Sequence, residues 1–187
     1  EIPINPYRVF WDVQQALDLR NTIATHDAGT PRDMMVPFWS ALEPNSYIGW
    51  GKSTHLGYGL PLAMGAKLAK PEKTVINIMG DLAFGMSGLE IETAFRNHLG
   101  TITIVFNNGL MGGYEQHIPI ATKLYGSRYI TGNYSKIGEG LGAYTERVER
   151  PDEIIPAVRR ALDVTKEGRP VLLEIMTREE TKLPKYW

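Results

Sequence analysis

Residues 74–81 read TVINIMGD, and residues 101–108 read TITIVFNN. Each stretch is a run rich in β-branched residues that ends in a polar pair, Gly80-Asp81 in the first and Asn107-Asn108 in the second. Such runs predict strands, and the helical segment between them completes a β-α-β unit. In a parallel sheet the carboxyl ends of the strands open onto a ligand crevice. The sequence therefore predicts that Asp81 and Asn108 lie side by side at that crevice.

Carboxylate and amide oxygens are hard ligands that suit Mg²⁺, which proteins usually hold with one or two carboxylates, phosphate oxygens and water. We therefore interpret Asp81 and Asn108 as ligands of a metal ion that bridges to a diphosphate. Each residue also has a structural alternative. Asp81 could cap the helix that follows its strand, and Asn108 could be a turn asparagine. The register that the two residues share favours the metal site.

With these motifs the chain resembles the thiamine-diphosphate enzymes, whose diphosphate-binding domain carries Gly-Asp-Gly followed later by Asn-Asn. Two further stretches support the resemblance, which covers nearly the whole chain. Residues 27–29 resemble the family's Asp-x-Gly turn, and residues 54–61 resemble its Thr-x-Met-Gly-x-Gly-x-Pro segment beneath the cofactor. One departure is Leu82, where most relatives have Gly. Leu82 together with residues 83–90 resembles the oxalyl-CoA decarboxylase and 2-hydroxyacyl-CoA lyase branch. The spacing between the motifs along the chain resembles that of acetolactate synthase.

The resemblance implies thiamine diphosphate and Mg²⁺ as cofactors. It implies that the side chains of Asp81 and Asn108 and the backbone carbonyl of Leu110 ligate the metal. Leu56 matches the bulky residue that bends the cofactor, and His55 beside it could face the pyrimidine or the substrate. A core leucine and a buried, satisfied histidine are the alternatives at these two positions. Further cofactor contacts are expected from Gly29, Thr30, Gly80, Leu82, Ala83 and Met111.

The function that the resemblance implies is decarboxylation, or C–C bond formation or cleavage, of 2-oxo acids or 2-hydroxyacyl thioesters. No catalytic residue can be assigned, because the family's activating glutamate lies in a separate pyrimidine-binding domain. Glu90 and Glu92 follow the diphosphate motif on a helix, which is the wrong place for that role. We expect that domain to come from the same or another subunit of a homo-oligomer, and the 187-residue chain alone to be inactive. The alternative, favoured by Leu82, is a non-catalytic cofactor-binding or structural subunit.

Length, composition and net charge limit the class of protein. The 187 residues suffice for one domain spanning 1–187, and 43% apolar with 22% charged residues is ordinary for a globular protein. The net charge of −1 provides no broad basic field for nucleic acid or an anionic membrane. No apolar run is long enough to span a membrane, and the absence of cysteine fits a cytoplasmic location. Because the chain begins at Glu1 within a proline-rich stretch, we expect the C-terminal part of a longer, multidomain protein.

Helical and strand patterns alternate along the chain, which predicts a doubly wound, mainly parallel α/β sheet with helices on both faces. The predicted strands are 21–26, 47–50, 74–79, 101–106, 144–148 and 171–176. The predicted helices are 7–19, 33–42, 57–69, 88–98, 134–141 and 152–166. Residues 109–133 are expected to be irregular, and loops of this length are usually functional or ordered by a partner.

A competing motif lies at residues 51–54, which read GKST and match the end of a phosphate-binding P-loop. The full pattern requires glycine five positions earlier, where the chain has Ser46. A nucleotide hydrolase would need Lys52 to bind ATP, whereas the thiamine interpretation predicts little effect of Lys52→Ala. Among the remaining histidines, His117 is expected at the surface, with a substrate-facing position as the alternative, and His26 is expected to be structural or exposed.

Overall fold

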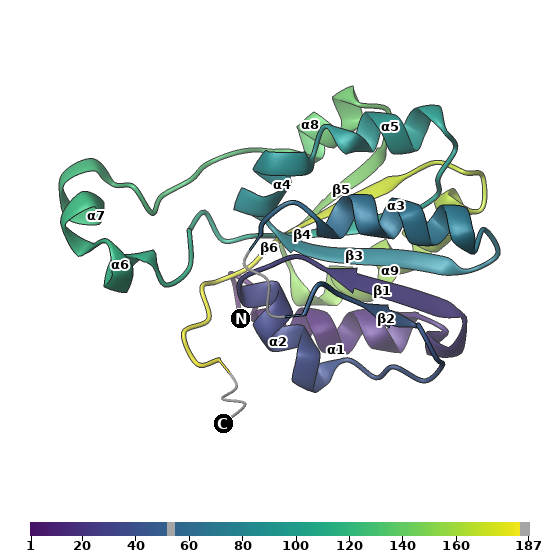
Figure 1. Ribbon diagram of the computed structural model, residues 1–187, viewed down its shortest axis with the longest axis horizontal. Coiled ribbons are helices and arrows are strands. Elements are labelled where there is room, and N and C mark those ends of the chain that lie inside the picture. Colours follow the sequence, from purple (N-terminus) through teal and green to yellow (C-terminus); the bar gives the residue numbers. More distant parts are fainter. Residues whose placement is uncertain (52–54, 184–187) are drawn as a thin grey trace.

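The computed structural model describes residues 1–51 and 55–183 and forms an open parallel sheet with helices on both faces (Figure 1). The strand order is β2-β1-β3-β4-β6-β5, and every neighbouring pair is parallel. This confirms the predicted doubly wound α/β fold. The strands are β1 (Thr22–His26), β2 (Tyr47–Ile48), β3 (Thr74–Gly80), β4 (Ile102–Asn107), β5 (Tyr144–Val148) and β6 (Val171–Met176).

Two layers of helices cover the sheet. One core cluster joins its first face to α1 (Pro6–Ala16), α2 (Thr30–Phe38) and α9 (Ile154–Thr165). A second cluster joins the other face to α3 (Gly59–Ala69), α4 (Asp81–Ser87), α5 (Glu90–Arg96) and α8 (Tyr134–Gly140). All residues of β1 and β4 are buried, because both faces of these strands are covered. Short 3₁₀ turns at Leu19–Asn21 and Pro151–Glu153 precede β1 and α9.

The unit between β3 and β4 differs from the single predicted helix 88–98. The chain instead forms α4, which starts directly at Asp81, and α5, with a break at Gly88 and Leu89. Strand β3 therefore passes into helix without a loop, and Asp81 stands at the junction. This places the candidate carboxylate at the first helical position rather than on a mobile connection.

Helix α2 also differs from its predicted range of 33–42, since it starts at Thr30 and ends at Phe38. Pro31 in the first turn suits a helix start, where its missing N–H costs nothing. Pro37 removes a helical hydrogen bond near the other end, and Trp39 is already extended. The helix therefore begins next to Gly29, at the expected cofactor turn.

Residues 109–130 form an arm that projects from the body of the sheet (Figure 1). The expected irregular stretch contains two short helices, α6 (Tyr114–His117) and α7 (Pro119–Tyr125), neither of which buries a residue. The two ends of the arm meet in an antiparallel bridge between Leu110 and Tyr129. The N–H of Ile130 donates to the carbonyl of Gly109 at 3.0 Å. The arm is thus a long loop whose two ends are held together at its base.

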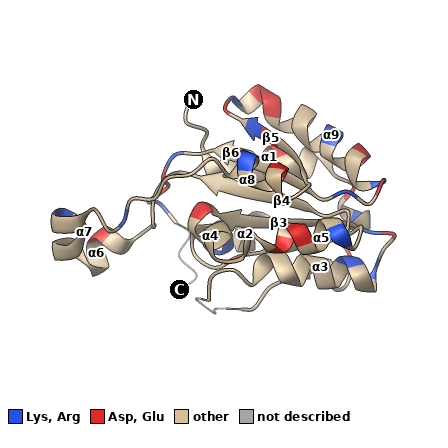
Figure 2. Ribbon diagram, turned by 90° about the horizontal axis from the view of Figure 1, so that it is seen from above, with Lys and Arg blue, Asp and Glu red and all other residues tan. Residues whose placement is uncertain are grey.

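Acidic and basic residues are interspersed along the outer helices, as Figure 2 shows for α5 and α9, which agrees with the net charge of −1. Across the residues that the structure describes, no helix combines the length and the apolar character needed to cross a membrane.

Candidate functional site

A cavity of about 460 Å³ opens at the carboxyl ends of β1, β3, β4 and β6. Its size is typical of a small-molecule site. Apart from His55, every residue that we predicted to contact the cofactor lines it: Gly29, Thr30, Leu56, Gly80, Asp81, Leu82, Ala83, Asn108, Leu110 and Met111. Residues far apart in the sequence therefore converge because parallel strands end on one edge of the sheet.

Asp81 is buried at the start of α4, where its carboxylate accepts backbone hydrogen bonds from both sides of the crevice. Its Oδ1 accepts from the N–H of Leu82 at 2.8 Å. Its Oδ2 accepts from the N–H groups of Asn108 at 3.1 Å and Gly109 at 2.8 Å. Burial raises the pKa of Asp81, while the hydrogen bonds from Gly109, Leu82 and Asn108 oppose that shift. The carboxylate thus ties β3 to the loop after β4.

Asn108 follows β4 and forms a local turn, since its Oδ1 accepts from the N–H of Leu110 at 3.0 Å. The turn interpretation and the ligand interpretation are compatible, because an amide oxygen has two lone pairs. Carboxylate oxygens likewise accept more than one bond. Asp81 and Asn108 therefore keep acceptor capacity toward the cavity. The backbone N–H of Leu82 donates to Asp81, and the expected contact of Leu82 with the cofactor stays a prediction.

The wall of the cavity leaves space for a bound group. A Cβ placed on Gly80 or on Gly29 would meet no atom within 4 Å, and both glycines line the cavity. Gly29 has φ +85°, a left-handed conformation that side chains rarely adopt. Thr177 Oγ1, also in the wall, is buried without a hydrogen-bond partner among the described residues. An anionic group that brings hydrogen-bond acceptors fits this lining.

Within residues 1–51 and 55–183, no three His, Cys, Asp or Glu side chains cluster in a way that could hold a metal. A metal in this cavity would instead use one carboxylate, one amide oxygen, a backbone carbonyl and oxygens from the bound group. That donor set suits Mg²⁺, which usually keeps few protein ligands. Asp81, Asn108 and Leu110 supply these three kinds of oxygen within the same lining.

The structure separates His55 from Leu56. Leu56 is half-buried, lines the cavity and packs against the second core cluster. His55 is exposed outside the lining, and its ring lies 6.1 Å from that of Trp50 in an edge-on contact. The expected contact of His55 with the cofactor finds no support in this cavity lining and stays a prediction. Thr54 of the same motif and Lys52 of the competing P-loop motif lie outside the described residues.

Asp27 determines where Leu56 lies. This fully buried carboxylate accepts from the N–H groups of Ala28 at 2.8 Å, Gly57 at 2.9 Å and Gly59 at 2.9 Å. It therefore holds the loop before α3 against the end of β1. A Cβ on Gly59 would lie 2.8 Å from the carbonyl oxygen of His26, so the close approach requires glycine. The Asp-x-Gly turn and the glycine pair were visible in the sequence, but their mutual hydrogen bonds were not.

Three residues of the lining, Arg32, Thr177 and Arg178, were not predicted from the sequence. His117 is exposed as expected and also belongs to the lining, which agrees with its alternative position. Thr177 directly follows β6, which neighbours β4, so its position after a strand was the available signal. His26, in contrast, is buried and structural, with the hydroxyl of Tyr58 3.2 Å from its Nδ1. Burial lowers the pKa of His26.

Comparison with protein families identifies one matching family model. The model described as "Thiamine pyrophosphate enzyme, C-terminal TPP binding domain" matches residues 27–175. The matched range begins at Asp27 and contains Leu56, Asp81, Asn108 and the arm.

Curated relatives resemble the chain along nearly its whole length. A probable acetolactate synthase of Mycobacterium bovis is 30% identical over 98% of this chain and 33% of its own length. A probable acetolactate synthase large subunit of Methanocaldococcus jannaschii is 31% identical over 97% of this chain and 32% of its own. A sulfoacetaldehyde acetyltransferase of Alcaligenes xylosoxydans is 30% identical over 95% of this chain and 30% of its own. The chain thus spans about a third of the length of these relatives.

Among solved structures, the thiamine diphosphate-dependent 4-hydroxybenzoylformate decarboxylase of Rhodococcus jostii RHA1 superposes with a TM-score of 0.81 at 24% identity. The match covers 96% of this chain and 33% of that protein. At this identity the likeness supports the fold alone.

Proposed function

The chain belongs to the thiamine pyrophosphate enzymes, as their C-terminal TPP-binding domain, and from that premise we propose that it holds thiamine diphosphate through Mg²⁺. In this role it is the diphosphate-binding part of an acetolactate-synthase-like enzyme. That enzyme decarboxylates 2-oxo acids or 2-hydroxyacyl thioesters, or makes and breaks their C–C bonds. The curated relatives named above are two probable acetolactate synthases and one sulfoacetaldehyde acetyltransferase.

One observation carries the proposal. Asp81, Asn108 and Leu110 follow the ends of two adjacent parallel strands and line a single cavity together with Leu56. In the proposed site the side chains of Asp81 and Asn108 and the carbonyl of Leu110 hold the metal. The open space over Gly29 and Gly80 accommodates the diphosphate. When bound, thiamine diphosphate supplies a nucleophilic carbon and an electron sink for carbonyl chemistry.

The chain's own residues prepare the site before anything binds. Asp27 holds the loop that carries Leu56, so that the leucine is fixed where it can support a bent cofactor. Asp81 holds the backbone of Asn108 and Gly109. Both carboxylates are buried, so these bonds lie in a low-dielectric setting where they are strong. Such preorganisation lowers the entropy that binding must overcome.

The proposal includes a partner. We propose that a pyrimidine-binding domain, from the same or another subunit of a homo-oligomer, supplies the activating glutamate and completes the substrate site. The exposed positions of Glu90 and Glu92 on α5, outside the cavity lining, agree with this arrangement. Turnover by residues 1–187 alone is expected to be absent, and we propose a cytoplasmic location for the enzyme.

A thermal-shift titration tests the cofactor site. Mg²⁺ with thiamine diphosphate should raise the melting temperature, because a ligand of the folded state adds about 2.7 kcal/mol at one hundred times its Kd. The shift should require Mg²⁺ and disappear in Asp81→Ala. Mg²⁺ with ATP is the control for the P-loop alternative. A shift with ATP that Lys52→Ala abolishes, and none with thiamine diphosphate, would overturn the proposal.

A second candidate is a non-catalytic cofactor-binding or structural subunit. Leu82 favours it, because its side chain lines the cavity where most relatives have glycine. Mixing the chain with its pyrimidine-binding partner and following 2-oxo acid decarboxylation separates the two candidates. Loss of carbon dioxide at a rate that depends on Asp81 supports the enzyme, and binding without turnover supports the subunit.

A further inference from the structure

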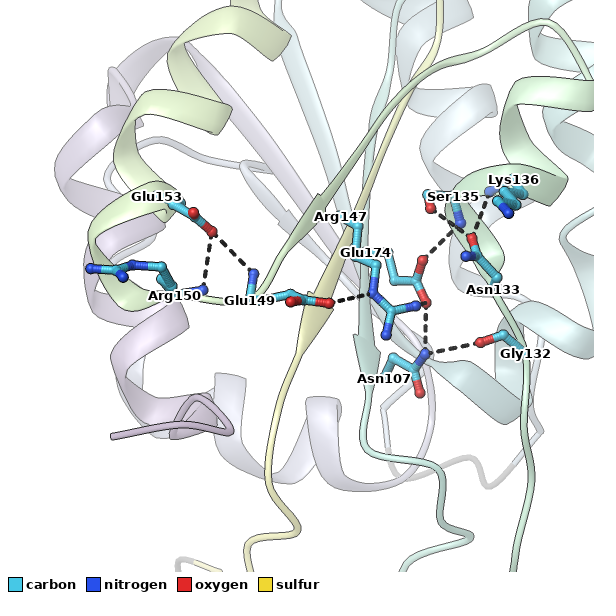
Figure 3. A network of polar contacts seen from close by, with 10 residues as sticks. All are labelled: Asn107, Gly132, Asn133, Ser135, Lys136, Arg147, Glu149, Arg150, Glu153 and Glu174. Carbon is cyan, nitrogen blue, oxygen red and sulfur yellow. Dashed lines mark hydrogen bonds and ion pairs between the residues drawn. The ribbon is translucent and has the colours of Figure 1, made fainter.

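Glu174 is a fully buried carboxylate in the middle of β6, between β4 and β5 (Figure 3). A buried charge is costly unless it is paired and hydrogen-bonded. One cation pairs with it at the edge of hydrogen-bond range, since Nη1 of Arg147 lies 3.5 Å from Oε1. Two closer donors satisfy it: Nδ2 of Asn107 at 2.6 Å and the backbone N–H of Ser135 at 2.9 Å. The partners of Glu174 therefore lie mainly in chain segments outside its own strand.

These two donors flank the arm. Asn107 is the last residue of β4, immediately before the arm, and Ser135 lies in the first turn of α8, soon after it. Nδ2 of Asn107 also donates to the carbonyl of Gly132 at 3.4 Å (Figure 3). A single carboxylate thus joins the chain before the arm to the chain after it.

The same strand end is held from the other side by Asp81. The N–H of Asn108, the residue after Asn107, donates to Oδ2 of Asp81, and the N–H of Gly109 does the same. Asn107, the last residue of β4, donates to Glu174 in the scaffold, whereas Asn108, in the turn that follows, borders the cavity. Two buried carboxylates fix three consecutive residues.

We propose that Glu174 is a positioning residue, whose carboxylate acts through Asn107 and the amide of Ser135 to hold Asn108 and Leu110 in place for the metal and the diphosphate. This inference rests on the proposed function for its ligand. The role requires a carboxylate, because both oxygens of Glu174 accept hydrogen bonds. Glutamine has only one oxygen, and its NH₂ group would face a donor.

Glu174→Gln in the intact chain tests the role by two measurements. The Kd for Mg²⁺ with thiamine diphosphate, from a thermal-shift concentration series, should rise about tenfold, the size expected when a buried hydrogen bond is lost. Amide hydrogen exchange without ligand should become about tenfold faster at Asn108 and Gly109, which would report local loosening. Asn107→Ala should give similar changes. The double variant should be no worse than the single ones, because the residues act through one contact.

Glu146→Gln is the matched control. Glu146 is also a strand carboxylate held by a guanidinium, with Arg160 Nε at 2.8 Å and Nη2 at 2.6 Å, but it lies on β5 away from the arm. The Glu146→Gln variant should change neither the Kd for Mg²⁺ with thiamine diphosphate nor the amide exchange at Asn108 and Gly109. A lower melting temperature in Glu174→Gln with unchanged Kd and exchange would overturn the proposal, as would additive effects of the two substitutions.

Two further outcomes remain decisive. If Glu174→Gln does not fold, Asn107→Ala decides by the same measurements, because it leaves the Ser135 bond to Glu174 intact. If the unaltered chain fails to bind thiamine diphosphate, the proposed function fails. Hydrogen exchange then still decides whether Glu174 holds the end of β4, and unchanged exchange overturns that role too.

Discussion

The rim of the cavity, at the carboxyl ends of the strands, is held in a different way from the arm. At the rim, buried Asp27, Asp81 and Glu174 each accept hydrogen bonds from backbone N–H groups. In the arm, α6 and α7 bury no residue, and apolar side chains such as Ile120 (74% exposed) and Tyr125 (81%) face outward. The carboxylates of the rim thus find their hydrogen-bond donors within the chain. The arm instead carries apolar surface of the kind that partners cover. Substitutions should therefore have large effects at the rim and small ones in the arm.

Asp27→Ala should have the largest effect. It leaves the N–H groups of Ala28, Gly57 and Gly59 buried without their acceptor. Each unsatisfied group costs about 1–3 kcal/mol, so the free energy of unfolding should fall by at least about 3 kcal/mol. Urea denaturation measures this change. Asp33→Ala, at a half-buried carboxylate in the nearby helix α2, is the control and should cost much less.

The glycines of α3 provide a matched pair. Gly59→Ala would place a Cβ 2.5 Å from Asn77 Oδ1 and 2.8 Å from the carbonyl of His26, which should cost about 1–3 kcal/mol. Gly65→Ala in the same helix meets no atom within 4 Å and should stabilise by about 0.5–1 kcal/mol. The difference in melting temperature between the variants checks both. Equal effects would show that the loop before α3 is not tightly held.

A smaller effect should appear as a pH dependence of stability through His26. Burial lowers its pKa from 6.5 in the folded chain, so the unfolded chain takes up the proton first as the pH falls. The stability contributed by neutral His26 should be complete above about pH 6.5 and be lost as the pH falls through the lowered pKa. Melting temperatures between pH 7.5 and 5 measure this. Within that range His26→Gln should flatten the profile, and a profile of unchanged slope would contradict the assignment.

Substitutions in the arm should change the global free energy of unfolding least. Arg128, buried near its base, pairs with Glu115 on α6 and with Glu179 after β6, the latter at 2.6 Å. Replacing Arg128 by methionine should change the free energy of unfolding by less than about 1 kcal/mol, because the arm adds little buried area and both carboxylates can reach water. Limited proteolysis within residues 111–127 should nevertheless accelerate. A large loss of global stability would show that the arm belongs to the cooperative core.

The rim could be predicted from the sequence because its chemistry is local to strand ends. Strand patterns that end in Asp81 and Asn108 require only the parallel topology to bring the two together. The hydrogen bonds of Asp27 and Glu174 could not be predicted in this way. They join residues 30 and 67 positions from their partners, and strand periodicity says nothing about which backbone groups lie within reach.

The differences between expectation and structure have specific physical causes. His55 was grouped with Leu56 by motif, but of the two only Leu56 lines the cavity, and the contact of His55 with the cofactor stays a prediction. The helix expected at 88–98 is present as α5, but α4 was missed because it begins directly at Asp81, without a loop after β3. The helices of the arm were missed because they bury no side chains, so no amphipathic pattern marked them.

Asp27 and Asp81 share a property with consequences for how such a protein can diversify. Every hydrogen bond described for their carboxylates comes from a backbone N–H, which every residue except proline provides. The side chains of donors such as Ala28 and Leu82 can therefore be exchanged without loss of these hydrogen bonds. Both residues line the cavity, so its surface can change while the hydrogen-bonded frame beneath it stays the same.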